Sequence, residues 1–532
     1  MTLLAHLLLL ATILAPLGLL ATAVTAQGRL RLPALLVYAP LPGLAAALIA
    51  GPAPPLVIYA DWLRLSLDLD APGALLLGVA ALLWSAAGAY ASAYLPGATR
   101  FAGWWLLTLA GSLGVFIAGD LVTFYFAFAL VSLAAYGLVV QDATRRARRA
   151  GAIYLALAVL GEVFLLFAFA LLAVSIPGQS LAIADAVAAL PNSLVRNETI
   201  LLLLLGFGLK AGLVPLHVWL PLAHPAAPMP ASAVLSGAII KAGIIGLIRF
   251  LPFEGGIAGW GLALGVLGFL TAFYGVALGI TQRNPKTILA YSSVSQMGVV
   301  MAALGFGLAA GDAATPLDAA RYASHHVLAK GALFLGVGVA LATGARRAAW
   351  IMAPVLLLVL SFGGLPLTGG ALAKEATKAQ LGAGVLGWLS ALSAAGTTML
   401  MLHFADRLRA GLAETPEASA PPGLILPFAV MTAGALLLPW WLYPAAVKFW
   451  PALWPVLLGA LGFLALRNWG GRLPRWPEGD VLIFAERAAA RVAPPLAERA
   501  SRIEATLRAW PSAGLALLVL ALLLGLAMAV AA

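Results

Sequence analysis

The sequence of 532 residues contains no cysteine and few charged residues. Without cysteine, the chain has no disulfides, no thiolate zinc sites and no cysteine-ligated iron–sulfur clusters, so it is not itself a redox centre. Charged residues make up 10% of the chain, far below the roughly 25% of soluble globular proteins, which excludes an ordinary soluble domain. The hydrophobic content of 63% and the mean hydropathy of +1.02 instead predict a membrane protein.

Hydrophobic segments of about 20 residues recur along the chain, each long enough to cross a bilayer as a helix. We therefore expect an all-α polytopic membrane protein with about 14–16 transmembrane helices. Residues 1–25 lack a basic region and a cleavage site, so we expect them to form the first span and not a removed signal peptide. The hydrophobic segments lie near residues 3–25, 32–51, 73–95, 101–119, 121–140, 151–175, 199–220, 229–252, 256–280, 287–310, 319–343, 350–381, 383–404, 422–445, 449–467 and 511–531.

The net charge of +11 comes from arginines that gather in short loops between the hydrophobic segments. The positive-inside rule accounts for this pattern, so we expect no nucleic-acid partner. The basic loops alternate along the chain and are predicted to be cytoplasmic, with both termini outside the inner (plasma) membrane of a prokaryote. These loops contain Arg29 with Arg31, Arg100, the run 145–149, Arg283 with Lys286, Arg346 with Arg347, and Arg407 with Arg409.

Two segments are not expected to span the membrane. Residues 63–70 alternate between apolar and polar with period two and predict a short extracellular strand that lies on the helix ends. Residues 480–508 mix Arg and Glu with Leu, Ile, Val and Ala and predict an amphipathic helix at the cytoplasmic surface, broken near Pro494-Pro495. That helix either links to the last span or couples it mechanically to the rest.

The seven lysines are distributed differently from the twenty-four arginines. Arginine occupies the loops, whereas Lys210, Lys241, Lys330 and Lys374 lie within hydrophobic segments. A charged side chain at the bilayer centre costs roughly 2.5–3.5 kcal/mol, so a function must offset the cost of keeping four of them. Because a buried lysine can lose its proton and an arginine cannot, these positions predict proton transfer.

Of the twenty acidic residues, Glu162 and Glu375 lie deep in or near a hydrophobic segment. An acid at the depth of Glu162 predicts a functional site and needs a cationic partner, for which Lys210 is the candidate. Glu375 adjoins Lys374, but the two side chains point about 100° apart on a helix. Glu375 is therefore either a functional carboxylate or a helix-end charge at a water-filled vestibule.

Four of the six histidines follow the same pattern as the lysines. His217 comes shortly after the first buried lysine, His325 and His326 precede Lys330, and His403 lies near the end of a hydrophobic segment. His326 and Lys330 are four residues apart and share one helical face, which favours a proton or water relay. We expect no metal, since these histidines lack carboxylate ligands at a suitable spacing, and no cofactor.

Two of the predicted spans are interrupted by proline and glycine. Residues 209–221 place prolines inside a hydrophobic segment just after Lys210, and residues 363–370 do the same just before Lys374. Such breaks are tolerated in a membrane only where the freed backbone groups face protein or water. Paired interruptions in two halves predict an inverted-repeat transporter of protons or cations, with its ion path near the midplane.

Five blocks of residues resemble the antiporter-like subunits of respiratory complex I, the Mrp cation/proton antiporters and membrane-bound hydrogenases. Taken in order, they cover roughly residues 60–410. The blocks are Leu209-Lys210 with Pro215-Leu216-His217-Val218-Trp219-Leu220-Pro221, Pro228-Met229-Pro230-Ala231-Ser232-Ala233-Val234-Leu235-Ser236-Gly237 with Lys241 and Arg249, Asn284-Pro285-Lys286 with Ala290-Tyr291-Ser292-Ser293-Val294-Ser295-Gln296-Met297-Gly298, His326-Val327-Leu328-Ala329-Lys330 with Leu333-Phe334, and Gly364-Leu365-Pro366-Leu367-Thr368-Gly369 with Lys374.

The resemblance implies two inverted five-helix repeats, each with a discontinuous helix, joined by a central hydrophilic axis. Residues 1–100 would hold N-terminal helices and the strand, 101–252 the first repeat, 253–410 the second, and 411–532 the C-terminal helices with the amphipathic segment. The roles carried over are the lysine of the first broken helix for Lys210, the bridging lysine for Lys241, the central lysine for Lys330, the terminal lysine for Lys374 and a relay between the halves for His326.

The chain departs from the family pattern at one position. The family carries a glutamate in a Trp-Glu-Leu-Met-Ser-Leu-like block, whereas the matching stretch here is Phe128-Ala129-Leu130-Val131-Ser132-Leu133. We expect Glu162, on the following helix, to replace the missing carboxylate as the partner of Lys210. Without that replacement, the first half would conduct poorly or serve only as a scaffold.

The sequence thus predicts a proton-translocating, antiporter-like membrane subunit of a hetero-oligomeric complex. Its axis would comprise Glu162, Lys210, Lys241, His326, Lys330 and Lys374, with His217, His325, Glu375 and His403 as secondary candidates. At most the chain is a translocase subunit of a complex I-like oxidoreductase or a hydrogenase, with other membrane subunits and a soluble redox partner.

Four alternatives remain open. The chain could belong to an Mrp-type Na⁺/H⁺ antiporter, or it could energise an inorganic-carbon uptake system with a zinc-bearing soluble partner. It could also be a membrane anchor with a vestigial proton path, which the loss of the carboxylate at Ala129 favours. A transporter of organic solutes is disfavoured, because the broken helices lack a polar substrate pocket.

Overall fold

The computed structural model describes residues 2–49, 54–59, 64–176, 180–470, 474, 476–484 and 486–487. Two units are distinguished, Met1–Glu478 and Gly479–Ala532. In the second unit, the described residues 481–484 and 486–487 are helical. The predicted span 511–531 and most of the predicted amphipathic segment 480–508 lie outside the described residues.

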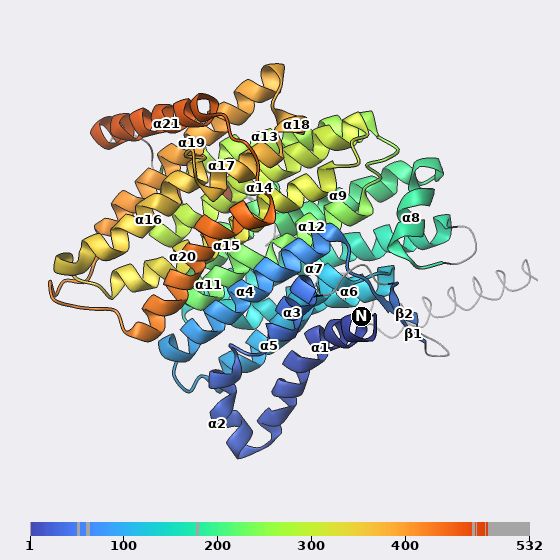
Figure 1. Ribbon diagram of the computed structural model, residues 1–532, viewed down its shortest axis with the longest axis horizontal. Coiled ribbons are helices and arrows are strands. Elements are labelled where there is room, and N and C mark those ends of the chain that lie inside the picture. Colours follow the sequence, from blue (N-terminus) through green and yellow to red (C-terminus); the bar gives the residue numbers. More distant parts are fainter. Residues whose placement is uncertain are drawn as a thin grey trace, which may run out of the picture. The chain divides into compact units, whose positions relative to one another are not determined.

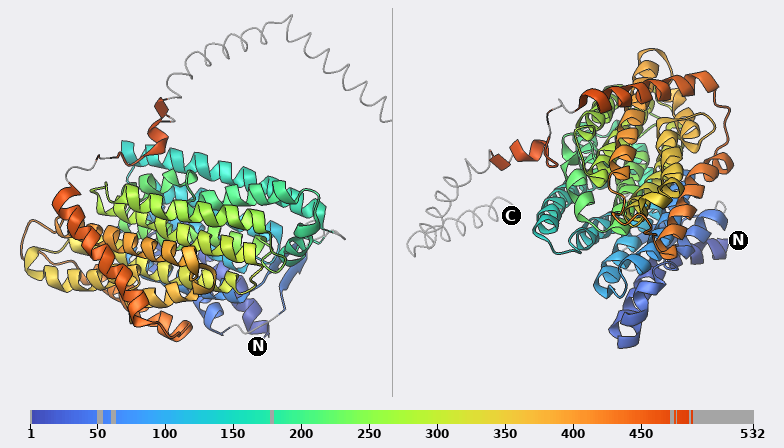
Figure 2. Two further views of the ribbon diagram at one scale, coloured as in Figure 1. Left: turned by 90° about the horizontal axis from the view of Figure 1, so that it is seen from above. Right: turned by 90° about the vertical axis from the view of Figure 1, so that its left-hand side faces the viewer.

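Fourteen helical segments in the described part of the chain are long and apolar enough to cross a membrane. They confirm the predicted all-α polytopic membrane protein, and the long helices of the first unit run side by side (Figures 1 and 2). The spans are α1 (Thr2–Ala21), α4 (Ala71–Tyr94), α5 (Thr99–Ile117), α6 (Leu121–Val139), α7 (Arg145–Ser175), α9 (Arg196–Ala211) with α10 (Trp219–Ala226), α11 (Met229–Val234) with α12 (Lys241–Phe250), α13 (Ala258–Gly279), α14 (Pro285–Ala310), α15 (Thr315–Leu341), α16 (Ala348–Gly363), α19 (Gly384–Arg409), α20 (Pro422–Leu442) and α21 (Phe449–Trp469).

The predicted span 32–51 is instead two short helices, α2 (Ala26–Leu35) and α3 (Leu41–Ile49), joined by a turn. The turn ends at Pro40, which has no backbone N–H to donate to a continuing helix and restricts the residue before it. Hydropathy alone could not reveal this interruption, because the turn residues are themselves apolar.

The predicted strand is present, with a partner that the sequence analysis missed. Strand β2 (Arg64–Leu67) pairs antiparallel with β1 (Leu56–Tyr59). Ser66 donates from its backbone N–H and its Oγ to Asp120 Oδ2, at 2.5 and 2.9 Å, and Asp120 caps the start of α6. This hairpin therefore lies on the helix ends, as expected.

Both predicted broken helices are present. Helix α9 ends at Gly212, whose φ is 87°, and a 3-10 turn (Leu216–Val218) leads into α10. Helix α16 ends at Gly364, whose φ is 93°, and short helices α17 (Gly369–Ala376) and α18 (Lys378–Leu381) follow. Glycine adopts these left-handed conformations without the steric cost that a Cβ would bring.

A third irregular element precedes Lys241. A π-helical segment (Leu235–Ile239) separates α11 from α12. Single π-helical turns inside helices occur mostly at functional sites, because they change the direction in which side chains point. Helix α15 packs against this segment and also against α4, α14, α16, α17 and α20. Helix α15 therefore lies at the centre of the first unit (Figure 1).

The short helix α8 (Ile183–Ala189) and the two strands of the hairpin complete the described fold. Helix α8 follows α7 and packs against α7 and α12. The hairpin described above lies next to α6. None of these elements carries a predicted site residue.

Candidate functional site

Lys210 lies in the last turn of α9, just before the first break, and only 3% of it is exposed. Its ammonium donates to Ser132 Oγ at 2.9 Å and to Tyr154 OH at 3.3 Å. The same nitrogen lies 5.6 Å from the ring centroids of Phe128 and Tyr154. These contacts hold the cation with neutral oxygens and aromatic faces.

Glu162 lies on α7 and is buried. Neither of its carboxylate oxygens has a hydrogen-bond partner in the described part of the chain. The carboxylate interacts electrostatically with Lys210 and also with Ser132, to which Lys210 donates. The structure thus brings Glu162 and Lys210 close together in the interior. They share Ser132 as a neighbour and form no direct ion pair within the described residues.

The carboxylate of Glu162 also faces the side of α6 that carries Ala129. Tyr125, Ala129 and Ser132 are spaced by four and three residues, so they lie on one face of that helix. Glu162 interacts electrostatically with Tyr125, and Ser132 lies near its carboxylate. The carboxylate on α7 therefore lies near the face of α6 that carries residue 129.

Lys241 and His326 are in direct contact in the central region. Lys241 Nζ lies 2.5 Å from His326 Nδ1 and 3.2 Å from the backbone oxygen of Ser236, in the π-helical segment. His326 Nε2 is buried and has no hydrogen-bond partner among the described residues. A hydrogen bond between two nitrogens needs one donor and one lone pair, so Lys241 and His326 cannot both be fully protonated in this geometry.

Lys330 lies one turn further along α15 and is fully buried. Its ammonium donates to the backbone oxygen of Leu289 at 2.7 Å and to Ser292 Oγ, and it lies 5.1 Å from the ring centroid of Phe362. The hydrogen bonds of Lys330 to described residues therefore end on neutral oxygens.

Lys374 lies on α17, after the second break, and its nitrogen is 6.0 Å from the ring centroid of Tyr322. It lines a cavity of about 420 Å³ together with Gly364, Glu375 and Lys378. Glu375 forms its ion pair with Lys378, at 2.9 Å, and not with Lys374. The half-buried lysine at the second break thus lines a cavity and has no carboxylate partner within the described residues.

The other predicted histidines differ in position. His325 Nε2 lies 3.2 Å from Ser361 Oγ, next to the second break, and interacts electrostatically with Lys374. His217 is buried in the first break, with its ring 5.0 Å from that of Tyr274. His403 Nε2 contacts the backbone oxygen of Gln282 at 2.8 Å, at the end of α13 and away from the buried lysines.

The structure also reveals a buried histidine and a buried lysine that the sequence analysis did not single out. His224, on α10, is fully buried, and neither ring nitrogen has a hydrogen-bond partner among the described residues. It stacks on Phe334 and interacts electrostatically with Lys286 and Lys330. Lys286, assigned to a basic loop, is buried and donates to the backbone oxygen of Ala227. His224 lies three residues beyond the first proline-interrupted segment, and the sequence alone did not indicate its neighbours.

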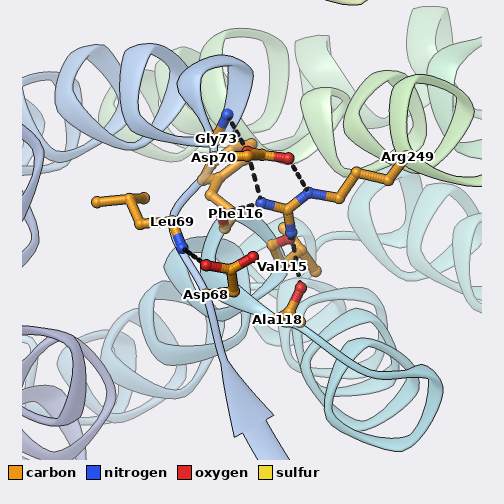
Figure 3. Close-up of polar contacts among 8 residues, drawn as sticks. All are labelled: Asp68, Leu69, Asp70, Gly73, Val115, Phe116, Ala118 and Arg249. Carbon is orange, nitrogen blue, oxygen red and sulfur yellow. Dashed lines mark hydrogen bonds and ion pairs between the residues drawn. The ribbon is translucent and has the colours of Figure 1, made fainter. Parts of the chain in front are cut away.

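Arg249 fixes the far end of α12, the helix that begins with Lys241 (Figure 3). Its guanidinium donates to both carboxylate oxygens of Asp70, at 2.9 and 3.1 Å, and to three backbone oxygens at the end of α5. Asp70 in turn accepts from Gly73 N and caps α4. Burial raises the pKa of Asp70, but the charge and hydrogen bonds of Arg249 outweigh this and hold the pKa below its usual value.

The described part of the chain contains no group of three or more His, Cys, Asp or Glu side chains that could hold a metal ion. What it contains is a series of buried amines and imidazoles, separated by serine, threonine, tyrosine and glutamine side chains. Between Lys374 and the interior, for example, Tyr322 donates to Gln296, and Gln296 donates to Thr397. Such groups form continuous hydrogen-bonded chains in a buried interior.

Known proteins resemble this chain in sequence and in fold. Residues 118–400 match the family described as NADH:quinone oxidoreductase/Mrp antiporter, transmembrane. The chain is 29% identical over 350 residues to hydrogenase-4 component B of Escherichia coli, covering 61% of this chain and 51% of that protein. It is 34% identical over 322 residues to NADH-quinone oxidoreductase subunit N of Desulforudis audaxviator, covering 56% and 63%.

The fold is also similar to a solved structure, the Mrp complex from Dietzia sp. DQ12-45-1b, with a TM-score of 0.78 at 23% identity. The alignment covers 99% of this chain and 63% of the matching chain. The matched regions thus span about half to two thirds of these three proteins.

Proposed function

Because this chain belongs to the NADH:quinone oxidoreductase/Mrp antiporter transmembrane family, we propose that it translocates protons as an antiporter-like subunit of a multisubunit complex. One observation carries the proposal. Lys210, Lys241 with His326, and Lys330 lie buried in the helical bundle, Lys374 lies half-buried in a further element, and each is held by neutral groups. A bundle that served only as an anchor would be more stable with apolar side chains at these positions.

The central pair is suited to proton exchange. Lys241 and His326 share one hydrogen bond between two nitrogens, so a proton can reside on either of them. His326 Nε2 has no partner among the described residues and is the free end of this pair. A proton that leaves through this nitrogen reaches the region of Lys330, which lies on the same face of α15. The pair therefore connects the first half of the chain to the second.

Glu162 serves as the carboxylate of the first half in place of residue 129. The support for this role is that Glu162 interacts with Tyr125 and Ser132, which flank Ala129 on one face of α6. A small residue at 129 leaves room for a carboxylate that arrives from α7. The replacement keeps one acid near Lys210, although the acid has moved to the neighbouring helix.

The first half works by a change in the distance between Glu162 and Lys210. Lys210 donates to Ser132 and Tyr154, while Glu162 has no hydrogen bond within the described residues, which corresponds to an open pair. Closing the pair draws the ammonium toward the carboxylate and lowers the positive potential at Lys241. Reopening it repels the proton on the central pair toward Lys330 and Lys374. The membrane potential supplies a comparable energy, about 2.3 kcal/mol per charge per 100 mV.

Residues 101–252 and 253–410 form the two inverted repeats of this transporter. Support comes from the two broken helices, since α9 and α16 are both 16 residues long and both end at a glycine with positive φ. Residues 1–100 and 411–532 flank the repeats. The termini of the chain lie outside the plasma membrane, because the basic loops alternate along the sequence.

The partners are other membrane subunits, joined by a soluble redox protein in a complex I-like or hydrogenase assembly. Sodium ions replace or accompany protons if the host is an Mrp-type antiporter, and a soluble zinc protein joins if the host takes up inorganic carbon. Purification of the tagged chain in mild detergent, followed by mass spectrometry of copurifying proteins, distinguishes these hosts.

A membrane anchor with a vestigial proton path is the second candidate. The observation that favours it is the pair of carboxylate oxygens on Glu162 that have no hydrogen bond within the described residues, together with alanine at position 129. On this alternative, the charge of Glu162 has no role in transport. The two candidates therefore differ in what they predict for variants of these two residues.

The test is a carboxylate swap in the purified complex, reconstituted into liposomes. Glu162→Ala is expected to lower proton transport by at least about tenfold, because the amine of Lys210 loses the one acid near it among the described residues. Adding Ala129→Glu to that variant is expected to recover much of the transport, since the new carboxylate reaches the same site from α6. Glu198→Ala, which removes an exposed acid at the start of α9, is the matched control and should change little. Full transport by Glu162→Ala, or a double variant no better than the single one, contradicts the proposal.

A further inference from the structure

Two neighbouring cavities lie at the helix ends where α13, α14 and α19 meet. One has a volume of about 150 Å³ and the other about 570 Å³, and Arg283 and Arg407 line both. Arg467 adds a further cation to the smaller cavity, and Lys286 adds one to the larger. We call this set of four cations the basic site.

The charge of the basic site is only partly neutralised within the described part of the chain, where Asp142 interacts electrostatically with Lys286. Asp406 is the one acid there that lines either cavity, and it pairs with the neighbouring Arg407 at 3.0 Å. Arg407 Nε is nevertheless buried and has no hydrogen-bond partner among the described residues. An unpaired buried donor is costly, so a guanidinium in this state is expected to bind an acceptor from outside the chain.

The polar groups behind the arginines do not supply that acceptor. His403 already contacts the backbone oxygen of Gln282, and the Gln282 amide donates to the backbone oxygen of Trp476 at 3.1 Å. These contacts fix the floor of the smaller cavity. The arginine donors therefore remain available, and Arg283 and Arg407 line both cavities.

The cavity walls indicate what kind of anion fits. Met229, Val337 and Leu341 line the larger cavity, and Phe463 and Leu466 line the smaller one. The site lies at the ends of the spans, where a lipid head group lies in a membrane. Arginine binds phosphate oxygens through two parallel hydrogen bonds, and basic pockets between transmembrane helices bind anionic head groups.

We propose that the basic site binds the phosphate of an anionic phospholipid. The guanidinium groups of Arg283 and Arg407 hold the phosphate between the two cavities, and the lipid chains follow the apolar walls of the larger cavity. A free phosphate ion would satisfy the same donors but would leave those apolar walls uncovered. The lipid therefore accounts for both the charge and the shape of the site.

The test measures lipid binding to the purified full chain by native mass spectrometry, with phosphatidylglycerol as the probe and phosphatidylcholine as the zwitterionic comparison. Phosphatidylglycerol is expected to bind in saturable fashion and more tightly than phosphatidylcholine. Arg283→Gln combined with Arg407→Gln should weaken it more than tenfold, since each cation near the membrane surface contributes about fivefold. Arg467→Gln should weaken it by less, because it reaches one cavity alone.

Arg409→Gln is the matched control. It removes the same charge from the same helix end, but Arg409 is exposed and lines neither cavity. Tryptophan-fluorescence melting shows whether each variant folds. If the double variant does not fold, the test compares phosphatidylglycerol binding by Arg467→Gln with binding by Arg409→Gln. Weaker binding by Arg467→Gln supports the proposal.

Three results would overturn the proposal. One is equal binding by the wild type and by whichever basic-site variant folds. Another is an equal loss in Arg409→Gln, which would indicate non-specific attraction. The third is displacement of phosphatidylglycerol by millimolar inorganic phosphate, which would make the site one for the free ion.

Discussion

The first broken helix ends at Gly212 and the second at Gly364, and the two breaks share one backbone design. In the first, Leu213 N–H bonds to the oxygen of Gly208 at 2.8 Å, and in the second, Leu365 N–H bonds to the oxygen of Leu360 at 3.0 Å. Both glycines have a positive φ. The same capping arrangement thus ends a 16-residue helix inside the bundle twice.

The lysines at the two breaks have different surroundings. Lys210 comes before its glycine and is enclosed by Ser132, Tyr154 and Phe128, with Glu162 nearby. Lys374 comes after its glycine, lines a cavity of about 420 Å³ and has no carboxylate hydrogen bond within the described residues. The two breaks therefore share a backbone arrangement and differ in electrostatics, which supports the proposal of a switch at the first break and an outlet at the second.

Lys330 connects the two breaks, and its removal should have the largest effect. Lys330→Met keeps the length and apolar body of the side chain but removes the amine that the proton must reach. Coupled proton transport in liposomes should fall by about a hundredfold or more, while assembly is unchanged. Lys378→Met, at a half-exposed ion pair, is the control. Transport above a tenth of the wild-type rate in Lys330→Met would show that the breaks work independently.

Alanine at either glycine should cost similar stability but unequal transport. Each substitution forces a left-handed backbone onto an L-residue, which costs about 1–2 kcal/mol and should lower both melting temperatures by a similar amount. A Cβ at Gly364 would come within 2.6 Å of Lys374 Cδ, so the lysine must move, whereas a Cβ at Gly212 would meet Leu220. Gly364→Ala should therefore lose about tenfold more transport than Gly212→Ala. Equal transport in the two variants would mean that the position of Lys374 does not matter.

The sequence allowed the breaks and the buried lysines to be predicted because both are expensive in a membrane. Proline and glycine within the hydrophobic segments at 209–221 and 363–370 predict broken helices, and the structure confirms both breaks. The burial of Lys210, Lys241 and Lys330 followed from their position inside apolar segments. These features are local, so a single sequence contains them.

The contacts between helices could not be predicted in the same way. Ser132 as the neighbour of both Glu162 and Lys210 depends on how α6, α7 and α9 pack, and serine is common in transmembrane helices. His224 becomes relevant only because α10 turns it toward Lys286 and Lys330. The roles of all these residues in transport stay predictions.

Acid should weaken the ion pair between Asp70 and Arg249, which fixes the end of α12 in the first half of the chain. The pKa of Asp70 is lowered in the fold, chiefly by Arg249 acting against burial. Its contribution is therefore complete above the unfolded pKa, about 3.9, and is lost as the pH falls through the lower folded value. Asp70→Asn should lose about 1 kcal/mol at neutral pH, after allowance for its partial exposure to solvent, and should lack this acid-dependent loss.

Melting temperatures between pH 7 and pH 3, followed by tryptophan fluorescence, measure this difference. Asp318→Asn removes a carboxylate that pairs with Arg321 three residues away, and it serves as the control. An unchanged acid limb in Asp70→Asn would assign the loss of stability at low pH to other carboxylates.

Glu375→Gln should have the smallest effect and bears most directly on the difference between the breaks. Glu375 pairs with Lys378 at the half-exposed end of α17, and such pairs contribute about 0.2–1 kcal/mol to stability. If the second break is an outlet without a carboxylate switch, transport should fall less than about twofold, against at least about tenfold for the loss of the Glu162 carboxylate. Proton transport by the two variants, measured side by side in liposomes, decides the matter. Losses of equal size would mean that each lysine works with its own acid, and the two breaks would then be electrostatically alike.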